Sequence, residues 1–263
     1  MSIPADTHLA LPDQIANLLL ALIYIGDIKA GDKLPPERVL AQQLEVDRTS
    51  LRSAIRTLIS MNLVRSVQGS GITVLDYREN GELNFSERLC QIDELEMSRE
   101  WIQAAFEFKL TFVPTYLHAI PDVLESSKRE EILALCQQQF TQAKLGASPK
   151  ELAEIEVQLQ QFLARISGNP FVMLHTNTMH YLNLRLMTIL YEGVNAKTYL
   201  KAQNEIISEL LAGNINVEKM KESLLTLFNK HAKNVKKRIN ILPEKARLIS
   251  SPLKHKPKML SLA

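Results

Sequence analysis

Cysteine and long apolar runs are scarce in this sequence. Its 263 residues include 2 cysteines, Cys90 and Cys136, which lie far apart and lack metal-ligand spacing. This excludes a disulfide-stapled scaffold and a cysteine-based zinc module. No run of 18 apolar residues occurs, and the N-terminus lacks the basic-then-apolar layout of a secretion signal. We therefore expect reduced core thiols, no membrane span and a cytoplasmic protein.

Neither sign of charge predominates. There are 31 Lys and Arg residues against 29 Asp and Glu, a formal net charge of +2. This balance argues against a protein that coats nucleic acid or a membrane surface, but it is compatible with DNA binding through a local basic patch. Aromatic residues make up 6% and glycines number 9, which favours a globular, helix-rich chain.

Motifs for catalysis are also missing. The sequence has no Gly-x-Ser-x-Gly nucleophile turn, no glycine-rich phosphate loop before a helix and no His-Glu-x-x-His. We expect no enzymatic activity, no catalytic residue and no cofactor.

The sequence does contain a two-helix pattern at residues 34–58. Pro35 and Pro36 suit the first turn of a helix, and Asp47 stands at the N-cap position of a second one. That second helix would bury a stripe of apolar residues at the 3.6-residue period: Leu51, Ala54, Ile55, Leu58 and Ile59. Its first turn, residues 48–52, presents arginine and hydroxyl side chains outward, as in a helix that enters the DNA major groove. A surface hairpin without any DNA role remains the alternative, because such patterns are weak by themselves.

The flanking residues complete a winged helix-turn-helix. An amphipathic stripe from Ile15 to Ile23 predicts a preceding helix. Two β-prone runs, 63–67 and 72–75, flank a glycine-containing turn and predict a hairpin. Three helices and this hairpin predict a DNA-binding domain over residues 1–76, with the hairpin tip beside the second helix of the pair.

In their order, these motifs closely resemble the N-terminal domain of GntR-type bacterial transcription regulators. The resemblance runs from about Gln14 to Leu75 and rests on Leu-Pro-Pro-Glu-Arg at 34–38, Arg-Thr-Ser-Leu-Arg at 48–52 and Gly-Ser-Gly at 69–71. It implies DNA contacts by Arg38, Arg48, Thr49, Ser50, Arg52, Gln68, Gly69 and Ser70. Arginine can bind guanine in a bidentate manner, whereas hydroxyls and amides fix phosphates; which arginine reads a base stays open.

After a polar linker at 77–84, residues 85–241 show helical periodicity nearly throughout. Six or seven helices are predicted there, one of them from 171 to 191, so the whole chain is mainly α. This part resembles the FadR branch of the family, with Arg-Ile-Ser-Gly-Asn-Pro at 165–170 as the best anchor. The resemblance implies a homodimer and a helical domain that senses a small molecule. Residues 242–263 carry lysines without a core pattern and predict a disordered basic tail.

Many members of that branch bind a divalent metal through an aspartate and three histidines. The corresponding positions here hold Glu156, Gln160 and Gln203, and His231 alone matches a histidine. Glutamine is a poor ligand for zinc or nickel. We therefore expect no metal, and Glu156 and His231 are only weak candidates.

In this departure, and in its Ser-Gly-Asn-Pro at 167–170, the chain resembles metal-free members of the FadR branch, and that resemblance implies an acyl-CoA effector; a small organic acid is the other effector class. Four residues are candidates for the effector site: Lys109, Asn177, Tyr181 and Arg185. The two cations would anchor an anion, and the other two side chains would add hydrogen bonds. In the alternative interpretation, both cations form structural ion pairs with Glu107 or Glu156.

The sequence as a whole predicts a ligand-responsive transcription regulator that binds a pseudo-palindromic operator as a homodimer. A helical protein-interaction module joined to a DNA-binding domain, with no small-molecule effector, is the competing interpretation. The sequence does not decide between a repressor and an activator.

Overall fold

The computed structural model describes residues 9–253, which form two compact units. Of these residues, 9–97 and 245–253 belong to unit 1, and 98–244 belong to unit 2. The chain therefore passes from one unit to the other twice. No helix within the described ranges combines the length and apolar character needed to span a membrane.

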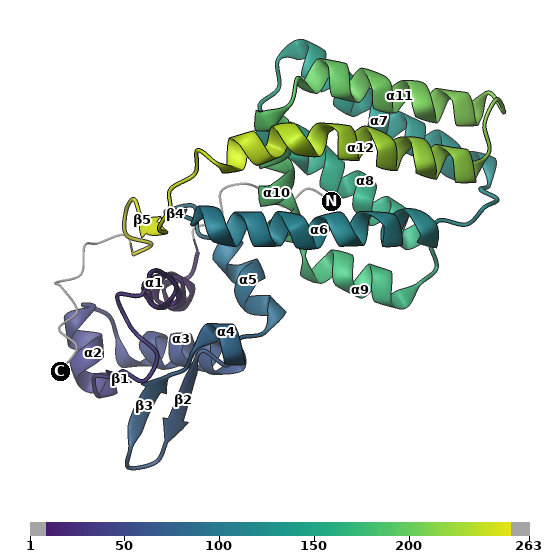
Figure 1. Cartoon of the computed structure of the whole chain (residues 1–263). Coiled ribbons are helices and arrows are strands. Elements are labelled where there is room, and N and C mark those ends of the chain that lie inside the picture. Colours follow the sequence, from purple (N-terminus) through teal and green to yellow (C-terminus); the bar gives the residue numbers. More distant parts are fainter. Residues whose placement is uncertain (1–8, 254–263) are drawn as a thin grey trace. The chain divides into compact units, whose positions relative to one another are not determined.

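Three helices and a small sheet form the first part of unit 1 (Figure 1). They are α1 (Leu11–Ile25), β1 (Lys33–Leu34), α2 (Glu37–Gln43), α3 (Arg48–Ser60), β2 (Val64–Val67) and β3 (Gly71–Val74). The strands are antiparallel in the order β1-β3-β2, with Val64 opposite Val74 and Leu34 opposite Ile72. This arrangement confirms the predicted winged helix-turn-helix.

Helix α3 begins where its sequence provides an N-cap. Asp47 accepts a hydrogen bond from the backbone N–H of Ser50 at 2.8 Å, which satisfies one of the free amides of the first turn. The predicted stripe is buried at Leu51, Ala54, Ile55 and Leu58. The prediction was wrong for Ile59, which is 38% exposed. It lies about 100° further around the helix than Leu58 and so leaves the buried face.

The segment after the hairpin also packs within unit 1. It contains α4 (Tyr77–Asn80) and α5 (Leu83–Cys90). The ring of Tyr77 lies 5.9 Å from that of Tyr24 on α1 and 5.0 Å from that of Phe85 on α5. Residues 77–84, which the sequence predicts as a linker, therefore include helical turns that pack against the first helix through an aromatic cluster.

The last described residues form part of unit 1. Strand β5 (Arg247–Leu248) pairs antiparallel with β4 (Leu95–Glu96). The carboxylate of Glu96 accepts from Arg247 at 2.7 Å, and Leu253 is only 2% exposed. Of the predicted basic tail, residues 254–263 lie outside the described residues. Disorder was the wrong prediction for residues 247–253, because strand pairing and one buried leucine hold them.

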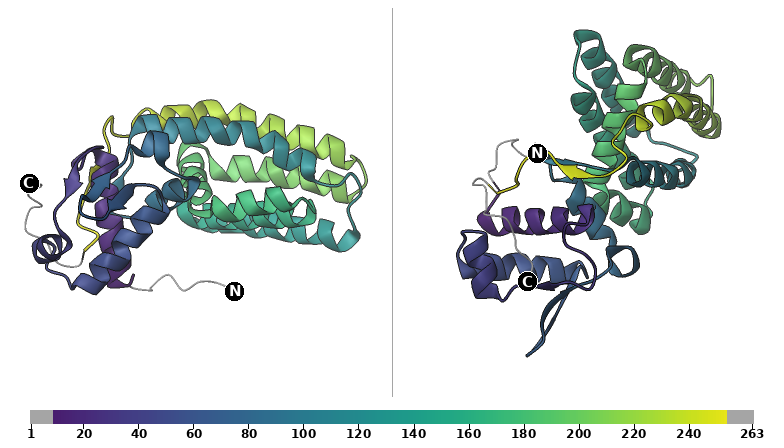
Figure 2. Two further views of the ribbon diagram at one scale, coloured as in Figure 1. Left: turned by 90° about the horizontal axis from the view of Figure 1, so that it is seen from below. Right: turned by 60° about the vertical axis from the view of Figure 1, so that its left-hand side comes forward.

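Unit 2 is all-helical, as predicted. Its seven helices are α6 (Arg99–Ala119), α7 (Ser126–Leu145), α8 (Pro149–Ile166), α9 (Pro170–Thr178), α10 (His180–Gly193), α11 (Ala196–Leu211) and α12 (Val217–Ile239). Helices α6 and α12 lie side by side, and α8 packs against both α7 and α10 (Figures 1 and 2). The helix predicted for residues 171–191 is divided at Met179, which caps both α9 and α10. One end of the bundle encloses an apolar core around Leu117, Ile132, Cys136, Phe162, Leu210 and Met220.

Candidate functional site

Three arginines form a stripe along the exposed face of α3. Arg48, Arg52 and Arg56 follow one another at intervals of four residues, so they lie on the same side of the helix, and all three are exposed. In the first turn, Thr49 is exposed and Ser50 is half-buried. The opposite face carries the buried apolar stripe. Helix α3 therefore presents cations, hydroxyls and the positive end of its dipole on its free side.

The middle arginine of this stripe is held by α2. The guanidinium of Arg52 donates to the carboxylate of Glu37, with an Nη2–Oε2 distance of 2.7 Å. These hydrogen bonds lower the pKa of Glu37, and the charges of Arg48 and Arg56 act in the same direction. Arg52 is half exposed, at 53%, so the pair adds little stability, but it fixes where the guanidinium points. Sequence reasoning missed Arg56, although its spacing from Arg52 was a usable signal.

The tip of the wing is formed by Gln68, Gly69 and Ser70, between β2 and β3. All three residues are exposed. Gly69 has a φ of 78°, a conformation that glycine adopts without strain and that lets the hairpin turn tightly. The ammonium of Lys33 on β1 lies 3.4 Å from the hydroxyl of Ser70, so a further cation stands beside the tip. Arg38, on α2, is likewise exposed.

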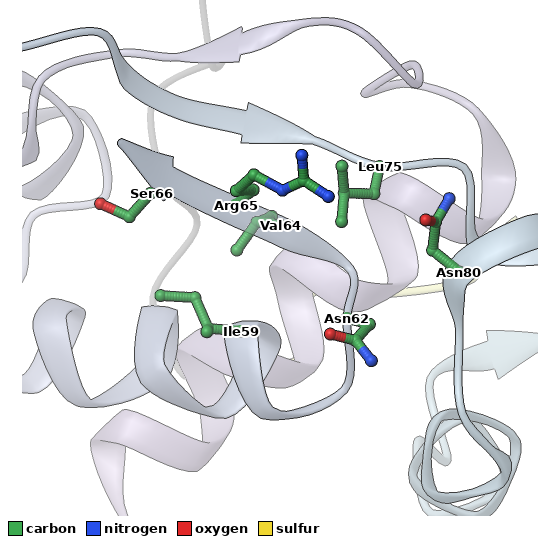
Figure 3. Close-up of a pocket in the computed structure, with 7 residues that line it drawn as sticks. All are labelled: Ile59, Asn62, Val64, Arg65, Ser66, Leu75 and Asn80. Atoms are coloured by element: carbon green, nitrogen blue, oxygen red, sulfur yellow. The ribbon is translucent and has the colours of Figure 1, made fainter. Parts of the chain in front are cut away.

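A pocket of about 350 Å³ lies on the flank of unit 1 (Figure 3). The end of α3, strand β2 and helix α4 contribute its lining: Ile59, Asn62, Val64, Arg65, Ser66, Leu75 and Asn80. Its polar groups are two amides, a guanidinium and a hydroxyl, and the exposed Ile59 forms part of its apolar wall. None of the eight residues predicted to contact DNA lines this pocket, so it is a separate feature of unit 1.

In unit 2, the ammonium of Lys109 on α6 is buried, with 7% of the residue exposed. Its Nζ donates to Asn183 Oδ1 on α10 at 2.9 Å and to Gln160 Oε1 on α8 at 3.2 Å. The sequence alternative of a direct ion pair with Glu107 or Glu156 is therefore not what the structure contains, because two amide oxygens hold the ammonium. Burial lowers the pKa of Lys109 to about 8, and the charge of Glu156 opposes this shift.

Gln160 also donates to Glu156, which accepts hydrogen bonds from side chains of three helices, α7, α8 and α10. Its carboxylate accepts from Gln160 Nε2 at 3.2 Å, from the hydroxyl of Tyr191 at 3.0 Å and from Gln139 Nε2 at 3.3 Å. Gln160 thus connects the buried cation to the carboxylate through its own amide. Burial, followed by the charge of Glu156, raises the pKa of Tyr191 well above its usual value. The result is a polar chain through the bundle that ends in one cation and one anion.

Comparison with known proteins identifies the winged unit. Residues 11–74 match the family model for bacterial regulatory proteins of the gntR family. An Escherichia coli (strain K12) protein named "Putative L-lactate dehydrogenase operon regulatory protein" is 31% identical over 170 residues, which cover 63% of this chain and 62% of the relative. The mannosyl-D-glycerate transport/metabolism system repressor MngR from the same organism is 36% identical over 86 residues, which cover 31% of this chain and 36% of the relative. The chain matches less than two thirds of the length of either relative.

Residues 11–74, the winged part of unit 1, therefore belong to the GntR family. The matched family consists of regulatory proteins rather than enzymes. Among solved structures, that of Lar, which controls the expression of the Listeria monocytogenes agr system, aligns with a TM-score of 0.58 at 17% identity. The alignment covers 88% of this chain and 99% of that one, and it reveals a common fold.

The polar groups of the bundle do not fit the metal site that the FadR branch implies. Gln160 Oε1 already accepts from an ammonium, and the carboxylate of Glu156 already accepts from three donors. His231 contributes one imidazole, whose ring packs edge-on against Tyr199. Across residues 9–253, no group of three His, Cys, Asp or Glu side chains converges on one point. The bundle instead contains a buried cation, Lys109, and we assign no step to a metal.

Of the four predicted effector residues, Lys109 lines a small cavity of the bundle. That cavity is also lined by His175, Asn183 and several apolar side chains. Asn177 is exposed on α9. Tyr181 and Arg185 lie one turn apart on α10, roughly on the opposite side of the helix from Asn183, which faces Lys109. Asn183 was not among the sequence candidates, since nothing local distinguishes it from a surface polar residue, and the sequence favoured a packing or hydrogen-bonding role for His175.

The stability of unit 2 should depend on pH through Lys109. In the unfolded chain its amine keeps the proton up to a pKa near 10.5, whereas in the folded chain it loses the proton near pH 8. Between these values the unfolded state binds more protons, so stability should rise with pH, by on the order of 2–3 kcal/mol. We expect this rise in the wild type and not in Lys109→Met, as measured by urea unfolding from pH 7 to 10.5. Identical pH dependence in both proteins would disprove it.

The comparison with Lys109→Met is needed because other buried groups of unit 2 change its stability with pH in the opposite direction. Burial raises the pKa of Cys136 to about 12 and also raises the pKa of Tyr191. These groups keep their protons in the folded state, so stability should fall as pH rises past their usual values. Their contribution is common to both proteins and cancels in the difference.

Proposed function

We propose that this GntR-family protein is a dimeric, ligand-responsive transcription regulator that binds duplex DNA through α3 and the wing. The observation that carries the proposal is the exposed stripe of Arg48, Arg52 and Arg56 on a helix whose other face is buried. An α-helix fits the DNA major groove, and arginine pairs with the O6 and N7 atoms of guanine there. A chromosomal operator would place the protein in the cytoplasm, as the sequence predicts.

Different residues would have different tasks at the DNA. Arg48, at the start of α3, would reach base edges. Thr49, Ser50 and the free amides of the first turn would bind phosphates, which positions the helix without reading sequence. Arg52 is already oriented by Glu37, so it would approach DNA with little loss of side-chain freedom. The tip of the wing, with Lys33 beside it, would contact the adjacent backbone or groove.

Arg48→Ala is expected to weaken binding to the specific operator roughly 5- to 150-fold, the range for loss of one bidentate base contact. The operator is first selected from a random duplex pool with the wild-type protein, and affinities are then measured by fluorescence anisotropy at fixed salt. Arg165→Ala, which removes an exposed arginine of unit 2, is the matched control and should leave affinity unchanged. Equal affinities for Arg48→Ala and wild type would contradict the proposed interface.

Dimerisation would give the operator its symmetry. Two winged units on one face of the duplex would occupy half-sites about one helical turn, or 34–36 Å, apart. Light scattering of the protein with and without the selected duplex tests this directly. Two chains per duplex is the expected result, and one chain per duplex would remove the dimer from the proposal.

The helical unit would bind the effector near Lys109. The two cavities in this region have volumes of about 10 and 160 Å³, below the roughly 300 Å³ at which drug-sized ligand pockets begin. Such space supports a small organic molecule in preference to an acyl-CoA. An effector changes DNA affinity only by its difference in affinity between two arrangements of the protein. The proposal therefore requires a ligand that shifts operator binding measurably.

A further inference from the structure

The amino group of Lys109 has the surroundings of a nucleophile, because in the part of the chain that the structure describes it forms hydrogen bonds with neutral amides and no ion pair with a carboxylate. Among the described residues it donates to two amide oxygens, on Gln160 and Asn183, and neither holds the proton on nitrogen as a carboxylate would. Burial lowers the pKa of this amine to about 8, so roughly a tenth of it is neutral at pH 7. A buried lysine of this kind can attack a carbonyl carbon, which an arginine in its place could not do.

Lys109 faces a small inner cavity with mainly apolar walls. Phe108, Met179, Leu182 and Leu186 contribute to the walls, and the volume of about 10 Å³ is close to that of one water molecule. Phe112 and His175 line this cavity and also line an outer pocket of about 160 Å³. Their rings are stacked, with centroids 4.1 Å apart and planes 4° from parallel. The stacked pair is therefore a wall that the two cavities share.

His175 supplies the second chemical group. Its imidazole lines the same inner cavity as Lys109, and both burial and the charge of Lys109 lower its pKa, so it is largely neutral near pH 7. A neutral imidazole can accept a proton and return it. Glu156, whose charge acts on Lys109, accepts a hydrogen bond from the amide of Gln160 and stabilises the ammonium.

We propose that Lys109 forms a reversible imine with a small aldehyde or ketone whose apolar body occupies the outer pocket. This inference rests on the proposed function, because it identifies the chemical class of the effector. In the first step the neutral amine forms a C–N bond to the carbonyl carbon, and a proton moves from nitrogen to oxygen. In the second step water leaves and a C=N bond forms. His175 carries the protons in both steps, and no oxidant or reductant is needed.

The walls of the outer pocket set the size and polarity of the ligand. Phe171 and Val172 offer apolar surface, and Thr115 and Asn169 are polar side chains at the same pocket. A ligand of a few carbon atoms fits this volume, and its carbonyl reaches Lys109 once the Phe112–His175 stack opens. A proton delivered by His175 from solvent to the imine nitrogen then gives an iminium, whose N–H can donate to Asn183, so that one of the two amide oxygens keeps a donor.

Reductive trapping tests the proposal on the full-length protein. The wild type is incubated with limiting butanal and sodium cyanoborohydride at pH 7, and butylated lysines are located by peptide mass spectrometry. Lys109 is expected to be labelled at least tenfold faster than Lys201, an exposed lysine of the same unit. Phe112→Ala, which removes one ring of the stack, should label faster still. Lys109→Arg keeps the cation and should lose this label.

His175→Gln adds a test of the proton carrier. It should slow labelling of Lys109 at least tenfold and flatten the dependence of its rate on pH between 6 and 8, while Lys201 is unaffected. The proposal is overturned if Lys109 remains unlabelled in both wild type and Phe112→Ala while Lys201 reacts. It is equally overturned if Lys109 reacts no faster than Lys201 in both proteins.

Measuring operator binding in the same samples distinguishes a failure of the imine proposal from a failure of the proposed regulator function. If Arg48-dependent DNA binding is present and Lys109 is not trapped, the imine alone is wrong. If no duplex is selected by the wild type, the regulator function fails whatever the labelling result.

Discussion

Glu156→Ala is expected to lower the free energy of unfolding of unit 2 by about 3–5 kcal/mol. The carboxylate of Glu156 accepts hydrogen bonds from Gln139, Gln160 and Tyr191. Alanine would leave these three donors without their acceptor inside the bundle, and it would remove the negative charge that opposes deprotonation of Lys109. Guanidinium unfolding followed by the fluorescence of Trp101, the single tryptophan and a residue of α6, reports on this unit.

Two further variants distinguish lost hydrogen bonds from lost charge. Glu156→Gln keeps an acceptor oxygen and should cost roughly half as much as the alanine variant, since hydrogen bonds to charged groups are about twice as strong as neutral ones. Glu154→Ala, at an exposed position of the same helix, should change stability by less than about 0.5 kcal/mol. If Glu156→Ala and Glu154→Ala cost the same, the polar chain contributes nothing to the stability of the bundle.

The winged part of unit 1 was predictable because each of its signals acts on nearby backbone. Asp47 caps α3 three residues from its partner, and Gly69 permits the turn in which it stands. The α3 stripe was read correctly from its period, apart from Ile59 at its edge. Such features require no knowledge of the rest of the chain, and this is why the family resemblance and the architecture agree.

The interior of unit 2 could not be predicted in the same way. Asn183 is 74 residues from Lys109 in the sequence, and Tyr191 is 35 residues from Glu156. The sequence named Asn177, Tyr181 and Arg185 beside Lys109 as effector-site candidates, but it gave no sign of Asn183, to which Lys109 donates. Nothing local tells a buried asparagine from an exposed one, because the difference lies in which helices become neighbours.

The structure of the C-terminal segment also could not be predicted from its composition. A run of lysines and arginines after residue 242 has the composition of a disordered tail. Its pairing with β4 uses backbone groups, which composition does not reveal, and the segment ends in two buried residues, Pro252 and Leu253. No periodic signal distinguishes Leu253 from Leu242 and Leu248 in the same segment, so its role became visible only in the folded unit.

Leu253→Ala should therefore destabilise unit 1 by about 3–5 kcal/mol, the usual cost of removing a fully buried leucine side chain from a packed site. The residue is 2% exposed, and the strand that precedes it is hydrogen-bonded to β4 and packs near α1. Amide hydrogen exchange of α1 is the suitable measurement, because it reports on unit 1 separately from the bundle. Ile249→Ala is the matched control, since that residue lies in the same segment at 60% exposure and its truncation should cost less than about 1 kcal/mol. Unchanged protection of α1 in Leu253→Ala would mean that the segment only rests on unit 1 and does not contribute to its core.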